Sequence, residues 1–331
     1  MNSAFRTILP PFKSPIKISH QDKVLCIGSC FAEHIGERLI YSKIPTSLNP
    51  FGIVYNPISI AGSLELLLQT DFIFSEKNDQ LVESPIGWNS FSHHGQFSHP
   101  EKEVVIEKIN HALAKTRDFL NNTTKLILTF GTANVFVYKK TGQIVANCHK
   151  VPQQEFEKRR LSIDEITKSI TVILHKLKKA FPHLEVITTV SPVRHIKDGL
   201  VENQRSKATL VMALNQLVEE NDFVHYFPSY ELLLDDLRDY RFYKKDMIHP
   251  TDMAVDYIWE YFSKTWFSQE TNDLNQKIKK IRMAASHRPF QPDSPNHLAF
   301  VKKQLMLIKE IEAEYDFLCF EKEKHAYAIQ L

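Results

Sequence analysis

Short apolar runs alternate along the chain with longer segments in which apolar residues recur every three or four positions. The runs at 24–27, 126–130, 186–190 and 223–227 predict buried strands. The helical spacing covers a segment that starts just after Cys30, then 104–120, about 162–181, 206–220 and 251–267. Buried strands that alternate with long helices predict a parallel sheet covered on both faces, and therefore an α/β fold.

Local signals refine this picture. Asn56 and Pro57 have the residue types of a helix N-cap and first helical position, and Ser162 with Glu165 forms a capping-box pattern. The segments 135–138 and 143–146 flank Thr141-Gly142, which predicts a hairpin. We therefore expect a small antiparallel unit beside the parallel sheet.

The strand pattern stops at about residue 266. Beyond it, apolar residues continue at helical spacing at Leu298, Val301, Leu305, Ile308 and Ile311. The segment 286–296 contains three prolines and is typical of a linker or an extended crossing. The predicted organisation is an α/β domain over 1–265 and a helical extension over 266–331.

Composition narrows the class of protein. The 331 residues are 43% hydrophobic and 24% charged, which is typical of a globular chain with a sizeable core. Lys plus Arg total 41 against 39 Asp plus Glu, so overall charge gives no attraction to nucleic acid or acidic membranes. Four scattered cysteines do not make a disulfide framework. With no secretory signal and no long apolar span, we expect a soluble, cytoplasmic protein.

The first segment that suggests chemistry lies between the first predicted strand and its helix, where Gly28 is followed by Ser29 and Cys30. A helix N-terminus offers free N–H groups and a positive dipole end. These favour a thiolate and can hold an oxyanion. The alternative is that Ser29 only caps the helix and Cys30 fills a gap in the core.

Two further segments carry reactive side chains. Asp246 and His249 are three residues apart, so in a tight turn the carboxylate can orient the imidazole as a base; the alternative is a surface loop with a capping Asp. After the hairpin, Asn147, Cys148, His149 and Lys150 follow one another and form either a substrate-facing wall or an ordinary polar loop.

Other polar groups have two interpretations each. The segment 88–99, with Trp88, His93, His94 and His99, lines a pocket, binds a metal or is a solvated loop. Basic residues near the expected active face either clamp an anionic substrate group or pair with Asp235, Asp236 and Asp239; they are Arg194, Arg205, Lys207, Arg238 and Arg241. No P-loop or dinucleotide fingerprint is present, and we expect no cofactor, no resident metal and no nucleic-acid partner.

The residues at 28–32 (GSCFA) resemble the signature of the GSCFA domain family. The resemblance extends from about 20 to 265 through the segments 49–57 (NPFGIVYNP), 147–152 (NCHKVP), 191–194 (SPVR), 206–208 (SKA), 226–231 (YFPSYE), 237–243 (LRDYRFY) and 246–250 (DMIHP). The family looks like a branch of the SGNH (GDSL-like) hydrolases. The resemblance therefore implies a flavodoxin-like three-layer α/β/α fold, here with a helical appendage.

The superfamily pattern also implies roles. Asp246 and His249 match its Asp-x-x-His, as orienter and base, whereas the turn 28–30 places Cys30 where the superfamily has its nucleophilic serine. Gly52, and either Asn134 or Asn147, are candidates for the oxyanion donors. His149, Lys150 and Arg194 are candidates for substrate binding. The implied activity is an esterase or acyltransferase that forms an acyl-enzyme on Cys30, or on Ser29.

The implied substrate is a small-molecule or carbohydrate-type ester or thioester, with an acyl-CoA donor possible for a transferase and a homo-oligomer possible for the chain. A non-catalytic binding or scaffolding protein on a hydrolase-derived fold is the alternative, because the Gly-Asp-Ser turn is missing.

Overall fold

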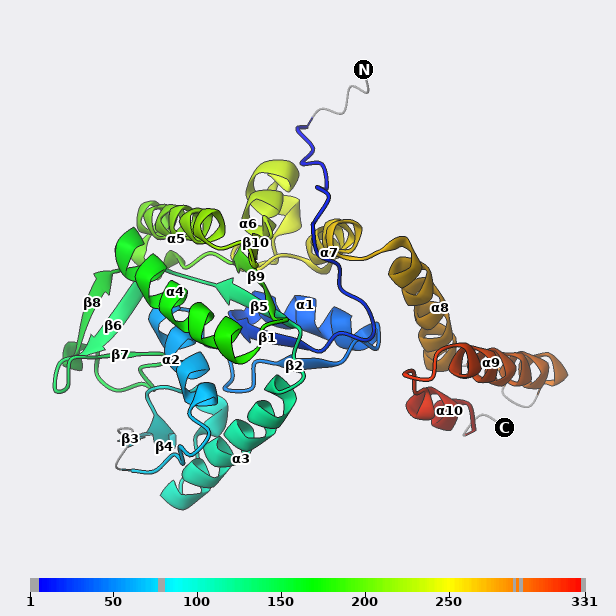
Figure 1. The fold of residues 1–331 in the computed structure, drawn as a ribbon, viewed down its shortest axis with the longest axis horizontal. Helices are drawn as coiled ribbons and strands as arrows, with labels where there is room; N and C mark the ends of the chain where they lie inside the picture. The colour runs from blue at the N-terminus through cyan, green and yellow to red at the C-terminus, as the bar shows by residue number, and fades with distance from the viewer. Residues whose placement is uncertain (1–5, 77–80, 288–289, 292–293, 329–331) are drawn as a thin grey trace.

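The computed structural model describes residues 6–76, 81–287, 290–291 and 294–328. Its centre is a parallel sheet of five strands in the order β10-β9-β5-β1-β2 (Figure 1). The strands are β1 (Val24–Gly28), β2 (Thr46–Leu48), β5 (Lys125–Phe130), β9 (Glu185–Val190) and β10 (Val224–Tyr226). The four apolar runs of the sequence form β1, β5, β9 and β10, and the α/β prediction is confirmed.

Helices cover both faces of this sheet because successive strand residues point to opposite sides. Leu25 and Ile27 of β1 pack into a core shared with the helices over residues 57–68, 102–120, 163–180 and 200–220. Val24 and Cys26 pack into a second core with the helices over residues 30–41 and 252–266. The result is the predicted three-layer α/β/α arrangement.

The covering helices agree with the sequence pattern in most places. They are α1 (Cys30–Tyr41), α2 (Pro57–Leu68), α3 (Lys102–Leu120), α4 (Ile163–Ala180), α5 (Leu200–Glu220) and α7 (Asp252–Trp266). Asn56 caps α2, and the capping box of Ser162 and Glu165 opens α4. Short helical turns at α6 (Ser229–Glu231) and Leu232–Leu237 follow β10. No helix among the described residues is both long and apolar enough to cross a bilayer.

Two small antiparallel sheets flank the core. The predicted hairpin forms β6 (Asn134–Tyr138) and β7 (Gln143–Val145), and an unpredicted strand, β8 (Phe156–Arg160), pairs with the other edge of β6. The strands β3 (Leu81–Ser84) and β4 (Gly87–Ser90) form a second hairpin.

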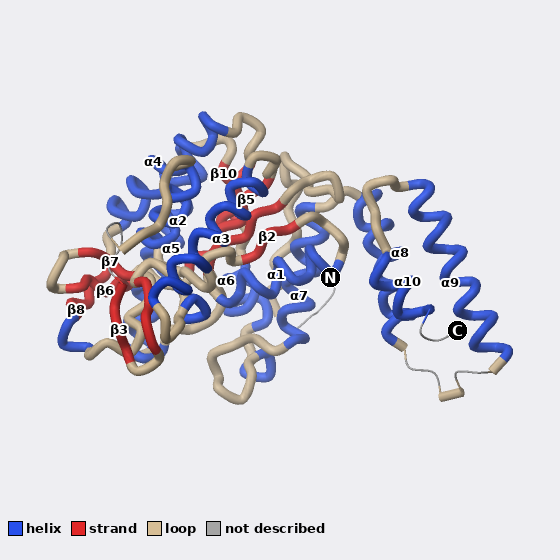
Figure 2. The backbone as a smooth tube through the Cα atoms, turned by 90° about the horizontal axis from the view of Figure 1, so that it is seen from below, coloured by secondary structure: helices blue, strands red, loops and turns tan. Residues whose placement is uncertain are grey.

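The C-terminal residues form three helices with a core of their own, α8 (Gln269–Ser286), α9 (Pro295–Glu314) and α10 (Glu321–Ala328). Both views place them together at one side of the α/β core (Figures 1 and 2). Residues 288–289 and 292–293 of the predicted linker lie outside the described residues, and Ser294 caps α9 with Pro295 in its first turn.

Candidate active site

The Gly28-Ser29-Cys30 turn lies at the carboxyl end of β1, where sites form in open α/β sheets. Gly28 has φ +155°, and a Cβ there would lie 2.3 Å from the carbonyl oxygen of Thr129 on the neighbouring strand. Only glycine allows this close approach. The turn is therefore fixed against β5 before it enters α1.

Ser29 is the N-cap of α1. Its Oγ accepts a hydrogen bond from the Phe31 N–H at 3.3 Å, and its own N–H donates to the Thr129 carbonyl at 3.0 Å. The residue is 2% exposed. The Ser29 hydroxyl is thus buried and caps the helix, as the alternative interpretation of this residue expects.

Cys30 is the first residue of α1 and is partly exposed. Burial raises the pKa of its thiol, and the charge of Glu33 adds to the rise. Lys207 and the N–H groups of Cys30 and Phe31 act in the opposite direction but are outweighed. In the free protein these favourable groups therefore do not compensate for burial, and the pKa of the thiol lies above its usual value.

The cation that acts on the Cys30 thiol is Lys207, which the sequence analysis named only among the basic residues near the expected active face. It is fully buried on α5, and its Nζ donates to the carbonyl oxygens of Gly131 at 2.7 Å and Ser191 at 2.6 Å. These carbonyls follow β5 and β9, so Lys207 ties two strand ends together. Burial lowers its pKa to about 7, and Cys30 opposes that shift.

Asp246 and His249 form the predicted pair. Asp246 Oδ2 lies 2.7 Å from His249 Nδ1, and Oδ1 accepts from the N–H groups of Ile248 and His249 at 2.9 and 3.0 Å. These bonds hold the pKa of Asp246 at about 2. Among the described residues, no hydrogen bond uses His249 Nε2, and none joins His249 to the Cys30 thiol.

A second imidazole lies near this pair, and the sequence interpretation did not include it. The His195 ring lies tilted against Tyr55 with ring centroids 5.2 Å apart, and the backbone N–H of His195 donates to Asn203 Oδ1 at 2.8 Å. Burial lowers the pKa of His195 to about 4, and the charges of Lys207 and His249 act in the same direction. Burial raises the pKa of Tyr55, and the charges of the Cys148 and Cys30 thiolates add to the rise. Tyr55 therefore interacts electrostatically with Cys30, and His195 with His249.

The candidate oxyanion donors differ in availability. The Gly52 N–H donates to the Asn49 carbonyl at 2.8 Å within a turn, so it is not a free donor. Asn134 Nδ2 lies 3.4 Å from Asp198 Oδ2 and borders a different, charged depression. Asn147 lines a cavity of about 320 Å³ together with Tyr55 and Cys148. Its Oδ1 accepts from the His149 N–H, and no hydrogen bond within the described part of the chain uses its Nδ2.

The predicted binding residues have different positions. His149 is buried, with Nε2 2.6 Å from the Ser90 carbonyl oxygen, so it anchors the loop rather than facing a substrate, whereas Lys150 is exposed. The Arg194 guanidinium lies over the Tyr243 ring at 4.3 Å and donates to the Tyr243 hydroxyl at 3.0 Å. Tyr243 precedes Asp246 by three residues. His93 is buried against Phe51, with Nδ1 2.7 Å from Ser90 Oγ. No group of three or more metal-ligating side chains occurs in the described parts of the chain.

The comparisons with known proteins agree with the turn motif. The sequence model of the GSCFA family matches residues 23–262, which is most of the chain. The chain belongs to the GSCFA family. A second model, for the C-terminal domain of GSCFA domain proteins, matches residues 278–331.

The other comparisons add little for this GSCFA-family chain. No curated protein matches it. One solved structure, from Streptococcus pneumonia and described as "a putative platelet activating factor", is similar with 12% identity and a TM-score of 0.38, covering 76% of this chain and 84% of that one. The role of Ser206 and Lys207 could not be predicted from spacing in the sequence. Ser206 Oγ accepts a hydrogen bond from the Ala133 N–H at 2.8 Å, and this contact holds Lys207 beside the ends of β5 and β9.

Proposed function

We propose that this GSCFA-family chain is an acyl hydrolase or acyltransferase of the SGNH kind that forms a covalent acyl-enzyme on Cys30. The observation that carries the proposal is the Asp246–His249 pair, 2.7 Å apart, in which Nδ1 faces the carboxylate and Nε2 is left for a reacting group. Cys30, partly exposed at a helix N-terminus, is the nucleophile, and Ser29 is its helix cap.

The reaction proceeds in two balanced steps. The Cys30 thiol gives its proton to His249 Nε2, and the sulfur attacks the carbonyl carbon of an ester or thioester. The bond to the leaving group breaks, and the imidazolium protonates the departing alcohol or thiol. Water or an acceptor hydroxyl then attacks the thioester and gives its proton to His249. The bond between the acyl carbon and the sulfur breaks, and the imidazolium returns the proton to Cys30, which restores the thiol and the neutral imidazole.

Three features of the site support this sequence of steps. The Lys207 ammonium and the N–H groups of Cys30 and Phe31 stabilise the thiolate, which burial alone disfavours. The Cys30 N–H and Asn147 Nδ2 are the proposed oxyanion donors. The cavity of about 320 Å³, with Val145, Val151 and Phe156 among its walls, is the proposed acyl site. Substrate is needed to bring the thiol and His249 together, since catalytic contacts are often loose in free enzymes.

The test uses the full chain with a simple acyl donor, S-acetyl-N-acetylcysteamine. We expect thioester cleavage and an acetylated intermediate detectable by intact mass. Cys30→Ala removes both signals, whereas Cys319→Ser, which changes an exposed thiol, leaves them. Activity that survives Cys30→Ala and is lost in Ser29→Ala would restore a serine nucleophile and refute the assignment.

A second candidate is a non-catalytic protein that holds an acyl-bearing ligand. The raised pKa of the Cys30 thiol favours it, because a resting thiol is a weak nucleophile. Under this alternative, Cys30 reacts with iodoacetamide no faster than Cys319, and no acetylated protein accumulates. Detection of the acetylated protein excludes it.

A further inference from the structure

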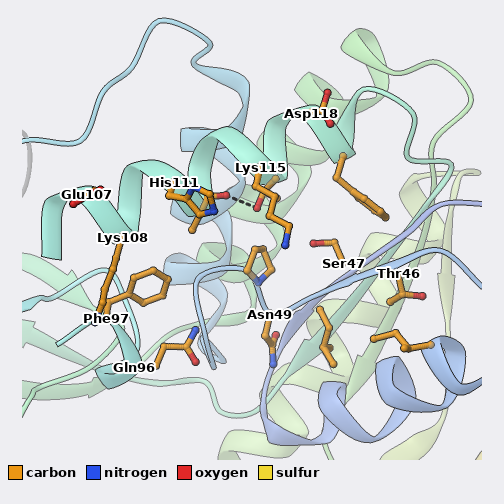
Figure 3. Close-up of a pocket in the computed structure, with 16 residues that line it drawn as sticks. Thr46, Ser47, Asn49, Gln96, Phe97, Glu107, Lys108, His111, Lys115 and Asp118 are labelled. Carbon is orange, nitrogen blue, oxygen red and sulfur yellow. Dashed lines mark hydrogen bonds between the residues drawn. The ribbon is translucent and has the colours of Figure 1, made fainter. Parts of the chain in front are cut away.

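A large cavity lies along the free edge of the sheet. It has a volume of about 1190 Å³ and runs between the edge strand β2 and α3 (Figure 3). Residues 46–50 line one side, Gln96 and Phe97 one end, and α3 the other side. Its volume exceeds the range of about 300–1,000 Å³ that is typical of small-molecule sites, so it has room for a ligand of that class.

The wall formed by α3 carries several charged side chains. Lys108, His111 and Lys115 line the cavity at positions i, i+3 and i+7, so they share one face of the helix. Lys115 points from α3 toward Ser47 and Asn49 (Figure 3). Glu107 and Asp118 of α3 also line the cavity, and Asp118 points away from Ser47 (Figure 3). Lys115 is thus the cation that faces the opposite wall most directly.

The two lysines also lack acidic partners. Among the ion pairs of the described residues, none involves Lys108 or Lys115. The charged depression beside Asn134 is different, since its Lys158 pairs with Asp198 and its Arg160 with Glu202. The cations of the α3 cavity are therefore available to an anion from solution, and those beside Asn134 are not.

The opposite wall provides polar and apolar surface. Ser47 offers a hydroxyl, and Leu48 and Pro50 offer apolar surface. Gln96 and Phe97 add an amide and a ring at one end, and Phe119 adds a ring from α3. An inorganic ion uses only the lysines of such a cavity. We propose that the cavity between β2 and α3 binds a phosphorylated organic molecule of nucleotide size, with its phosphates on Lys108 and Lys115 and its organic part against Phe97 or Phe119.

This site is distinct from the proposed acyl chemistry, and its binding does not depend on Cys30. The experiment measures binding of ADP, inorganic pyrophosphate and adenosine to the full chain by calorimetry. We expect ADP to bind with an affinity that falls as the salt concentration rises. Adenosine should bind at least about tenfold more weakly than ADP, because it lacks the charge-assisted contacts.

The variants separate this cavity from the rest of the surface. Lys108→Gln with Lys115→Gln should weaken ADP binding about tenfold or more, since two charge-assisted contacts are lost. Lys279→Gln, which changes an exposed and unpaired lysine on α8, should leave binding unchanged. Both lysines of the cavity are exposed, so the double variant should keep its fold, which circular dichroism checks.

Three results would overturn the proposal. One is that neither ADP nor pyrophosphate binds at millimolar concentration. Another is that ADP binds the wild type and the double variant equally, which places its site elsewhere. The third is that an acidic peptide binds in a manner that requires Lys108 and Lys115 while ADP does not, which would make the cavity a protein-docking groove.

Discussion

At the scale of single residues, the reactivity of Cys30 depends on a balance between burial and positive charge. Burial raises the pKa of the thiol, and Lys207 opposes this rise. We predict that Lys207→Met slows alkylation of Cys30 by iodoacetamide severalfold at neutral pH, because the remaining environment disfavours the thiolate more strongly. Peptide mass spectrometry at a series of pH values measures this rate for Cys30 alone.

The control for this change is Lys279→Met, which removes a charge far from the site. Lys207→Met also leaves the carbonyls of Gly131 and Ser191 without their donor, so we expect a loss of about 1–3 kcal/mol in stability as well. The rate is therefore compared only where both proteins are folded. An unchanged pH profile for Cys30 would show that Lys207 acts on the strand ends and not on the thiol.

A second prediction at this scale concerns His93. Burial lowers its pKa to about 3, whereas an unfolded histidine titrates near 6.5. Between these values the unfolded chain binds the additional proton, so the free energy of unfolding falls as the pH falls below about 6.5. This group alone contributes a slope of up to about 1.4 kcal/mol per pH unit.

Urea unfolding at several pH values between about 7 and 5 tests this dependence. His93→Gln keeps a polar side chain near Ser90 Oγ but cannot take up the proton, so its stability should fall less steeply with acid. Parallel slopes for the wild type and the variant would contradict the assignment of the acid sensitivity to His93.

At the scale of elements, Ser29 connects the turn to the helix that follows it. We predict that Ser29→Ala lowers the free energy of unfolding by about 1 kcal/mol, since the Phe31 N–H loses its acceptor, and that Ser29→Gly lowers it by only a few tenths. Both variants should still form the acetyl-enzyme on Cys30. Denaturant unfolding and intact mass measure the two effects separately.

The same scale shows which elements the sequence could predict. β1 and α1 were found because their apolar residues follow the periods of a strand and a helix. β8 was missed because four of its five residues are charged, and it is a strand only through its pairing with β6. The first turn of α5 was missed because Leu200 and Val201 are exposed there, which breaks the amphipathic pattern.

The residues of the candidate site likewise include some that the sequence could predict and some that it could not. The Asp246–His249 pair was predictable, because the contact is local and depends on a spacing of three residues. Lys207 and His195 come to the site from α5 and from the loop after β9, and no spacing in the sequence indicates that they meet Cys30 or Tyr55. The sign of the shift in the pKa of Cys30 depends on burial, which only the packed structure provides.

At the scale of the whole molecule, a small charged cluster joins the C-terminal helices to the α/β core. Glu323 on α10 is 5% exposed; its carboxylate lies 2.9 Å from Lys43 Nζ after α1 and 3.3 Å from Arg282 Nε on α8. Arg282 also donates to the Tyr41 carbonyl at 2.7 Å, and Lys43 to the Cys319 carbonyl at the same distance. One buried carboxylate therefore serves two cations on two different parts of the fold.

We predict that Glu323→Gln loosens the contact between these parts, because it leaves Lys43 and Arg282 partly buried without their counter-charge. The expected loss is about 2 kcal/mol or more, reduced from the value of a fully buried pair because Arg282 is partly solvated. Glu321→Gln is the matched control, since it changes an exposed carboxylate on the same helix that pairs only with Lys324. Hydrogen exchange should show faster exchange in α10 and at the end of α1 in Glu323→Gln but not in Glu321→Gln. Equal exchange in the two variants would mean that the apolar contacts, such as the stacking of His20 on Phe317, hold the helices in place by themselves.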